Sequence, residues 1–218
     1  MNLSNRLKTI YKMVPYSTVA DIGADHGKLI ISLFLDGVIE KGYAVENKKG
    51  PYDILVKALR ENNLEEDIVP LFSDGISELP SEVETIILAG MGGRTIIDIL
   101  YAHKEKLKNV TTIIVDAHSL IPNVRRKINE LGYVIADEKM VKEDNIYYEI
   151  IKFIKSDIAT LSDKDIEFGP ILRNEKSMLF KEKYRSRIKE IDTLLAKNLP
   201  LEKVHTLTDE KKRIEGIL

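Results

Sequence analysis

The chain of 218 residues contains no cysteine, no tryptophan and only four histidines. The absence of cysteine excludes disulfides, cysteine-ligated zinc, iron–sulfur clusters and thiol nucleophiles. The histidines are scattered through the sequence rather than grouped at the short spacings of metal ligands, so we expect no metal site. The chemistry of this protein must therefore use carboxylates, the backbone or a bound cofactor.

A long hydrophobic run and an excess of one charge are missing as well. The longest apolar stretch covers residues 29–35, which is far short of the roughly 20 residues that span a bilayer. The first 14 residues include three cations, which interrupt any signal-peptide core. We therefore expect no membrane contact and a cytoplasmic location. The 33 basic and 35 acidic side chains give a net charge of −2, which excludes a polycation but allows a local basic patch.

Short apolar segments alternate with amphipathic ones through the first two thirds of the chain. A first helix, stopped by Pro15, precedes this alternation. The predicted strands cover residues 18–22, 42–45, 67–72, 85–89 and 111–115, and the predicted helices between them cover residues 27–34, 51–62, 95–107 and 123–131. Because this alternation, with strands that are apolar on both sides, favours a parallel sheet covered on both faces, we predict an α/β, doubly wound sheet.

Two features predict the ends of the sheet. Pro70 lies inside the third strand and cannot donate a ladder hydrogen bond, so this strand should be at an edge, in the order 3-2-1. Residues 133–138 and 147–154 form a last pair of apolar segments with no room for a crossover helix between them. This pair should be an antiparallel hairpin.

The pattern changes after residue 156. Two amphipathic helical stripes follow, separated by a turn that contains Pro200. They predict an antiparallel, coiled-coil-like helical hairpin. We therefore divide the chain into a first domain of residues 1–156 and a C-terminal helical domain of residues 157–218.

Three carboxylates follow three successive predicted strands. Asp21 ends the first strand, Glu46 ends the second, and Asp74 with Gly75 follows the third. The carboxyl ends of parallel strands meet at one edge of a sheet, where ligands bind. Asp21 suits an ammonium group or a water, Glu46 can accept both ribose hydroxyls, and Asp74 can accept from an adenine amino group. Each residue alone could be an ordinary turn or solvated side chain, but the three together favour a nucleoside site.

Glycine-rich loops flank these carboxylates, in residues 21–27 and 89–93. Glycine lets a ligand approach the backbone closely. The dinucleotide fingerprint is not met, because Asp25 occupies the position of its second glycine. The residues predicted to bind the ligand are Asp21, Gly23, Asp25, His26, Gly27, Glu46, Asn47, Asp74, Gly75, Ala89, Gly90, Met91 and Gly92.

These motifs together resemble the TrmK family of bacterial tRNA (adenine-N1)-methyltransferases. The resemblance rests on Leu-Ser-Asn-Arg-Leu at 3–7, Ala-Asp-Ile-Gly-Ala-Asp-His at 20–26, Glu46 with Gly50-Pro51, Asp74-Gly75, Ala-Gly-Met-Gly-Gly at 89–93, Tyr148-Glu149 and Gly169-Pro170. It implies a Rossmann-like class I methyltransferase fold, S-adenosylmethionine as cofactor and position 22 in the D arm of tRNA as target. One position departs from the family, since Asp116-Ala117 stands where we expect Gln-Pro.

A tRNA partner requires cations that meet phosphates. The predicted RNA-binding residues are Arg6, Lys8, Arg94, Arg125, Arg126, Lys181, Lys183, Arg185 and Arg187. Asp25 is the candidate catalytic residue, stabilising the methyladenine cation, although it could instead hold the amino group of the cofactor. A monomer is favoured.

Two other functions are compatible with the residues. The same fold could methylate a protein or a small metabolite, with the helical hairpin as a lid. Alternatively, the chain could be a non-catalytic RNA-binding or partner-binding protein with a vestigial cofactor fold. The presence of all three strand-end carboxylates disfavours the second alternative.

Overall fold

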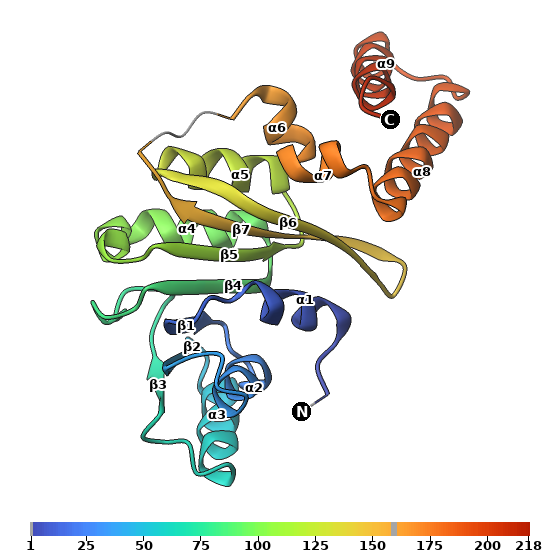
Figure 1. Ribbon diagram of the computed structural model, residues 1–218. Helices are drawn as coiled ribbons and strands as arrows, with labels where there is room; N and C mark the ends of the chain where they lie inside the picture. Colours follow the sequence, from blue (N-terminus) through green and yellow to red (C-terminus); the bar gives the residue numbers. More distant parts are fainter. Residues whose placement is uncertain (1, 158–160) are drawn as a thin grey trace.

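The computed structural model describes residues 2–157 and 161–218, and within these ranges one mixed sheet of seven strands has the order β3-β2-β1-β4-β5-β7-β6 (Figure 1). The strands are β1 (Thr18–Ile22), β2 (Lys41–Glu46), β3 (Ile68–Phe72), β4 (Thr85–Met91), β5 (Thr112–Ala117), β6 (Tyr133–Glu143) and β7 (Ile146–Lys155). Strands β1 to β5 are parallel, whereas β7 is antiparallel to both β5 and β6. The predicted doubly wound sheet with a terminal hairpin is confirmed.

The third strand lies at the edge, as its proline predicted. Pro70 is in register with Ala44 of β2, and β3 pairs with no other strand of the described ranges. Because β3 is at one end of the order and β6 at the other, the turn from β1 into its helix lies near the middle of the sheet. That turn is therefore surrounded by the ends of its neighbours.

Helices cover both faces of the sheet. One face carries α1 (Asn5–Met13), α2 (Lys28–Leu35) and α3 (Lys49–Glu61), and the other carries α4 (Gly93–Ala102) and α5 (Ile121–Glu130). Successive strand residues point to opposite layers, as Val19 and Ala20 do in β1. The fourth helix ends earlier than predicted, because the backbone at His103 leaves the helical region and a short 3₁₀ helix, η1 (Lys104–Lys108), follows.

The terminal hairpin is longer than the sequence predicted. Its strands run on to a two-residue turn at Asp144 and Asn145, where φ is 50° and 61°, as in the tight turns that suit twisted strands. The extension forms an arm that contacts two distant helices. Glu143 accepts a hydrogen bond from the backbone N–H of Asn5 at 3.0 Å, and Lys142 pairs with Glu182 at 2.6 Å.

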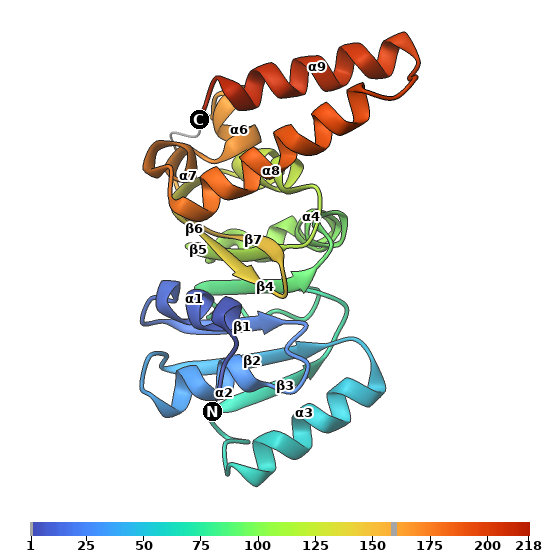
Figure 2. The same cartoon turned by 90° about the vertical axis from the view of Figure 1, so that its right-hand side faces the viewer.

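The C-terminal region contains four helices within residues 161–218, two more than predicted. They are α6 (Asp163–Phe168), α7 (Pro170–Glu175), α8 (Met178–Leu195) and α9 (Leu201–Glu215). Figure 2 shows α8 and α9 side by side and antiparallel, at the end of the molecule opposite β3, which confirms the helical hairpin. A separate apolar core holds these helices together around Phe180, Ile191 and Leu207. Short helices α6 and α7 lie between this hairpin and the sheet, against α5 and β6.

Candidate active site

Two adjoining cavities open at the carboxyl ends of the parallel strands. The first, which we call the β2–β3 cavity, has a volume of about 430 Å³ and is lined by Glu46, Asp74 and Met91 among others. The second, the β1–β4 cavity, has a volume of about 360 Å³ and is lined by Asp21 among others. Gly23 lines both cavities. The strand ends thus bring the three predicted carboxylates to one region of the surface.

The turn after β1 separates the two cavities. Gly23 has φ of 76°, a conformation that favours glycine, and a Cβ there would lie 3.3 Å from Cε of Met91. The backbone N–H groups of Gly23 and Ala24 donate to the carbonyl of Val45 at 2.9 and 3.1 Å. Asp25 follows with φ of 51°, and its N–H donates to Oε1 of Glu46 at 2.6 Å. These three hydrogen bonds attach the turn to the end of β2 and fix the position of the Glu46 side chain.

Asp21 lies in an environment that penalises its negative charge. It is 5% exposed, and burial together with the nearby charge of Glu46 raises the pKa of Asp21 to about 7. A buried acid beside a second acid is stabilised in its ionised form by a positively charged ligand. The electrostatics of the site therefore favour a cationic group in the β1–β4 cavity.

The remaining predicted ligand residues are distributed between the two cavities. Asn47 and Gly75 line the β2–β3 cavity, where Asn47 donates to Oδ1 of Asp74 at 3.1 Å. The β1–β4 cavity is lined by Asp25, His26, Ala89 and Gly90. Gly27 and Gly92 line neither cavity; Gly27 caps α2 and Gly92 caps α4.

Arg6 of α1 also lines the β1–β4 cavity, which places the first helix at the site. It was predicted as an RNA contact, and the structure shows a side chain only 19% exposed. Its guanidinium carbon lies 4.5 Å from the centre of the Tyr148 ring, and Nη1 is 3.0 Å from Nε2 of His118. The N-terminal helix therefore forms part of the cavity wall, and Tyr148 of the hairpin packs against Arg6.

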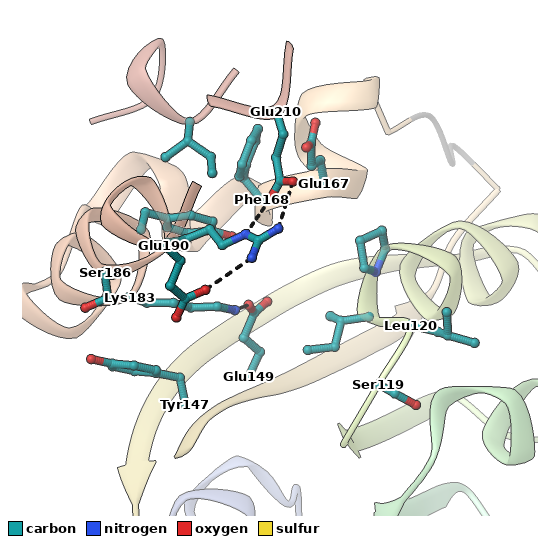
Figure 3. A pocket seen from close by; sticks show the side chains of 15 residues that line it. Ser119, Leu120, Tyr147, Glu149, Glu167, Phe168, Lys183, Ser186, Glu190 and Glu210 are labelled. Carbon is teal, nitrogen blue, oxygen red and sulfur yellow. Dashed lines mark hydrogen bonds and ion pairs between the residues drawn. The ribbon is translucent and has the colours of Figure 1, made fainter. Parts of the chain in front are cut away.

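A third cavity, the interhelical cavity, lies between the start of α5, strand β7 and helices α6, α8 and α9, with a volume of about 450 Å³ (Figure 3). Lys183 points to Glu149 and is ion-paired with it. Arg187 pairs with Glu210 at 2.7 Å and with Glu190 at 3.1 Å. Both cations were predicted to bind RNA, but their charges are already neutralised within a cavity that holds more carboxylates than cations.

The prediction that Arg125 binds RNA is wrong. This side chain has no exposed surface, and it donates to Glu138 at 2.9 Å and to Glu149 at 2.5 Å. A third hydrogen bond, of 3.3 Å, reaches the carbonyl of Ile166 in α6. Burial raises the pKa of Glu138, whereas Arg125 and Lys183 hold the pKa of Glu149 below its ordinary value against the effect of burial. Arg125 is a structural ion-pair centre, out of reach of any phosphate.

Residues 19–216 match the family model described as "TrmK: tRNA (adenine(22)-N(1))-methyltransferase". The chain belongs to the TrmK family. A tRNA (adenine(22)-N(1))-methyltransferase of Bacillus subtilis (strain 168) is 27% identical over 207 residues, which cover 89% of this chain and 84% of the relative. The family predicted from the motifs is confirmed.

Solved structures agree with this assignment over the full chain. A Streptococcus pneumoniae protein, a candidate tRNA (m1A22) methyltransferase, is 30% identical with a TM-score of 0.95 and 100% coverage of both chains. A second structure of that protein, in complex with S-adenosyl-L-methionine, has 30% identity, a TM-score of 0.92 and 100% coverage of both chains. The TrmK fold thus includes the C-terminal helices as well as the sheet.

The remaining predicted RNA contacts of this TrmK chain lie nearer the surface. Lys8, Arg94 and Arg126 are exposed, and Arg94 pairs with Asp98 one turn along α4 at 3.0 Å. On α8, Lys181, Arg185 and Lys189 are spaced four residues apart and fall on the side of the helix opposite Lys183 and Arg187. No ion pair joins any of the three to another described residue.

Residues 2–157 and 161–218 contain neither a candidate metal centre nor a candidate membrane-spanning helix. Among the described residues, no group of three or more His, Asp or Glu side chains is arranged to hold a metal ion. None of the helices in the same ranges is both long and apolar enough to cross a bilayer.

Proposed function

We propose that this chain transfers a methyl group from S-adenosylmethionine to N1 of adenine 22 in tRNA. The observation that carries the proposal is the buried carboxylate pair, Asp21 and Glu46, between two adjoining cavities in a chain of the TrmK family. The family match disfavours both a protein or metabolite acceptor and a non-catalytic role.

The residues of the two cavities fit the chemistry of this cofactor. S-adenosylmethionine carries an ammonium and a sulfonium, and it supplies an electrophilic methyl group when bound. Asp21, with its raised pKa, suits the ammonium, while Glu46 and Asp74 at the β2–β3 cavity suit the ribose hydroxyls and the adenine amino group. Gly23 leaves backbone open to both cavities, and Gly90 leaves backbone open to the β1–β4 cavity.

The affinity for S-adenosylmethionine should rise with pH up to about 7. In the free protein the pKa of Asp21 is about 7, whereas a bound cation favours the ionised carboxylate, so binding at lower pH must first remove a proton. Isothermal titration between about pH 5.5 and pH 7 should show on the order of a tenfold gain in affinity. The amino group of the ligand stays charged across this range and does not obscure the effect.

The matched control for this titration is Asp21→Asn. This variant keeps the shape of the side chain but has no proton to lose, so its affinity should be lower at pH 7 and independent of pH below that value. A wild-type affinity that stayed flat from about pH 5.5 to 7 would show that Asp21 is not the group that faces the cation.

The acceptor needs little help from an acid or a base. Adenine N1 has a lone pair that is unprotonated at neutral pH, so the protein must supply alignment and a surface that tolerates the positive charge acquired by the ring. The carboxylate of Asp25, which lines the β1–β4 cavity and is 69% exposed, is our candidate for that role. The same carboxylate could instead contact the amino group of the cofactor. Turnover of Asp25→Asn at saturating cofactor separates the two roles.

The C-terminal helices, residues 157–218, are the part of the chain that we propose as the main tRNA-binding region. Exposed cations on the outer side of α8, together with Lys8, Arg94 and Arg126, can meet phosphates of a structured RNA. The target base must be turned out of its stack to enter the cavity, at a cost of a few kcal/mol. Contacts to the RNA backbone offset that cost.

The direct test is methyl transfer from radiolabelled S-adenosylmethionine to an unmodified tRNA transcript, followed by nucleoside analysis. We expect one labelled 1-methyladenosine per transcript and none in a matched transcript with guanine at position 22. Label in both transcripts, or label on a different nucleoside, would overturn the proposed target. Binding of S-adenosylmethionine without transfer to any RNA would favour one of the two other functions.

A further inference from the structure

Asp116, at the carboxyl end of β5, is a fully buried carboxylate with few hydrogen-bond donors around it. It is 0% exposed, and within the described part of the chain no side-chain donor is in good hydrogen-bond geometry with either oxygen. Burial raises the pKa of Asp116, and the nearby backbone N–H of Gly90 acts against that effect. The nearest cation is Arg6, with Nε at 3.3 Å from Oδ2. A buried carboxylate with so few donors lowers stability when it is ionised, and an apolar side chain would serve a purely structural role better.

The Arg6 guanidinium is enclosed by groups that are distant in the sequence, from residues 116–148. Its face lies on the ring of Tyr148, and Nη1 meets His118 at 3.0 Å. Glu143, at the tip of the hairpin arm, lies 3.8 Å from Nε. The ring of His118 in turn packs edge-on against Tyr148 at 5.6 Å. Arg6 is therefore held in one orientation by strands β5, β6 and β7.

The orientation directs Arg6 into the catalytic region. Arg6 lines the β1–β4 cavity together with Asp21 and Gly90. Its Nη2 lies 3.9 Å from the position that a Cβ on Gly90 would occupy. The edge of the guanidinium thus lies beside the glycine-rich loop, on the same side of the sheet as the carboxylates that we assign to the cofactor.

We propose that Asp116 is a positioning residue that acts through Arg6, holding its guanidinium at the wall of the β1–β4 cavity, where its free N–H donors bind the acceptor nucleotide. This inference rests on the proposed function. A guanidinium offers planar donors that match the phosphate oxygens and the ring nitrogens of a purine nucleotide other than N1, so the lone pair of N1 stays free to attack the methyl group. Its charge, however, opposes the positive charge that the base acquires on methylation. Asp116 behind Arg6, with Glu143 beside it, offsets that charge while the donors stay available.

The arrangement predicts strong coupling between the two residues in catalysis. Asp116→Asn, which keeps the shape but removes the charge, should lower kcat/KM for tRNA on the order of tenfold, because a misplaced contact near the reacting atoms slows transfer steeply. Arg6→Gln should lower it at least as much. In the Arg6→Gln background, Asp116→Asn should have no further effect beyond about twofold.

The experiment measures kcat and KM for an adenine-22 transcript, and the affinity for S-adenosylmethionine, in wild type, both single variants and the double variant. We expect the affinity for S-adenosylmethionine to change much less than kcat/KM for tRNA in all of them, since the proposed contact of Arg6 is to the acceptor nucleotide and neither residue lines the β2–β3 cavity. Arg6→Lys, which keeps the charge but not the planar fork, should lower kcat/KM almost as much as Arg6→Gln.

If the loss of kcat/KM in the double variant equalled the product of the two single losses, Asp116 would act independently of Arg6 and the inference would be overturned. Wild-type activity in Asp116→Asn would overturn it too, as would a parallel loss of cofactor affinity, which indicates general damage to the sheet edge. A wild-type chain that bound S-adenosylmethionine but methylated no tRNA would overturn the proposed function itself, and this inference with it.

Discussion

Replacing Arg125 with methionine is expected to lower the free energy of unfolding by about 3–5 kcal/mol at pH 7. The substitution keeps most of the side-chain volume but leaves Glu138 and Glu149 buried without the cation that joins them, at 0% and 2% exposed. Lys183 can compensate only in part, because it contacts Glu149 alone. Urea denaturation followed by circular dichroism measures the loss.

The dependence of this loss on pH identifies its cause. Without Arg125, burial raises the pKa of both glutamates, so protonation at lower pH removes the unpaired charges. The difference between variant and wild type should therefore narrow as the pH falls from about 7 to about 5. Arg126→Met, one residue further along α5 on its exposed side, is the matched control and should change stability by about 0.5 kcal/mol or less. A loss below about 1 kcal/mol in Arg125→Met would contradict the assigned role.

The same ion pairs determine where the C-terminal helices lie. Glu138 also accepts hydrogen bonds from the backbone N–H groups of Ile171 and Leu172 at 3.0 and 3.4 Å, at the start of α7. Gly169, just before this helix, allows the approach, because a Cβ there would lie 2.5 Å from both Glu138 oxygens. The network thus joins α5 and the hairpin strands to α6, α7 and α8, and it holds the proposed RNA-binding helices beside the catalytic crevice.

Local sequence signals were sufficient for the sheet and for the ligand crevice. Pro70 predicted an edge strand because proline has no backbone N–H to donate to a neighbouring strand. Asp21, Glu46 and Asp74 were predicted to lie together because the carboxyl ends of parallel strands meet at one edge of the sheet. Helices α6 and α7 were missed because six residues each, too few for a periodic pattern, give no helical stripe.

Arg125 and Arg6 show what a local pattern cannot predict. A charged residue on an amphipathic helix is predicted to be exposed unless its ion-pair partners are known. The partners of Arg125 lie on the two strands of the terminal hairpin, outside the helix that carries it. Arg6 and Asp116 are brought together only when α1 packs against strands β6 and β7. Such ion pairs depend on tertiary packing between distant segments, and the spacing of residues within one helix or strand does not predict them.

The cations of α8 are a second case in which the sequence does not show which charges are ion-paired. The alternate spacing of the cations in residues 181–189 spreads them around the helix, a pattern that fits a solvated face as well as an RNA contact. In the structure the set divides into two sides. Lys183 and Arg187 turn toward the interhelical cavity and are ion-paired there, so we propose the outward side of α8 as the one that contacts phosphates.

Replacing the outward cations together, as Lys181→Gln, Arg185→Gln and Lys189→Gln, is expected to weaken tRNA binding on the order of 100-fold at about 0.1 M salt. Each phosphate contact releases close to one counterion, so the slope of log affinity against log salt concentration should become shallower by about 2 to 3. Glutamine is a good helix former and preserves α8. Fluorescence anisotropy with labelled tRNA at several salt concentrations measures both quantities, and the affinity for S-adenosylmethionine should not change.

The control removes the same number of charges at the opposite edge of the sheet. Lys104→Gln, Lys106→Gln and Lys108→Gln alter η1, which precedes the amino end of β5 and so lies far from the strand ends that form the crevice. Net charge changes equally in the two triple variants, so a general electrostatic effect would weaken both alike. Only a local phosphate contact weakens the α8 variant selectively. Equal losses in the two variants, or an unchanged salt slope in the first, would show that the RNA does not lie along the outward side of α8.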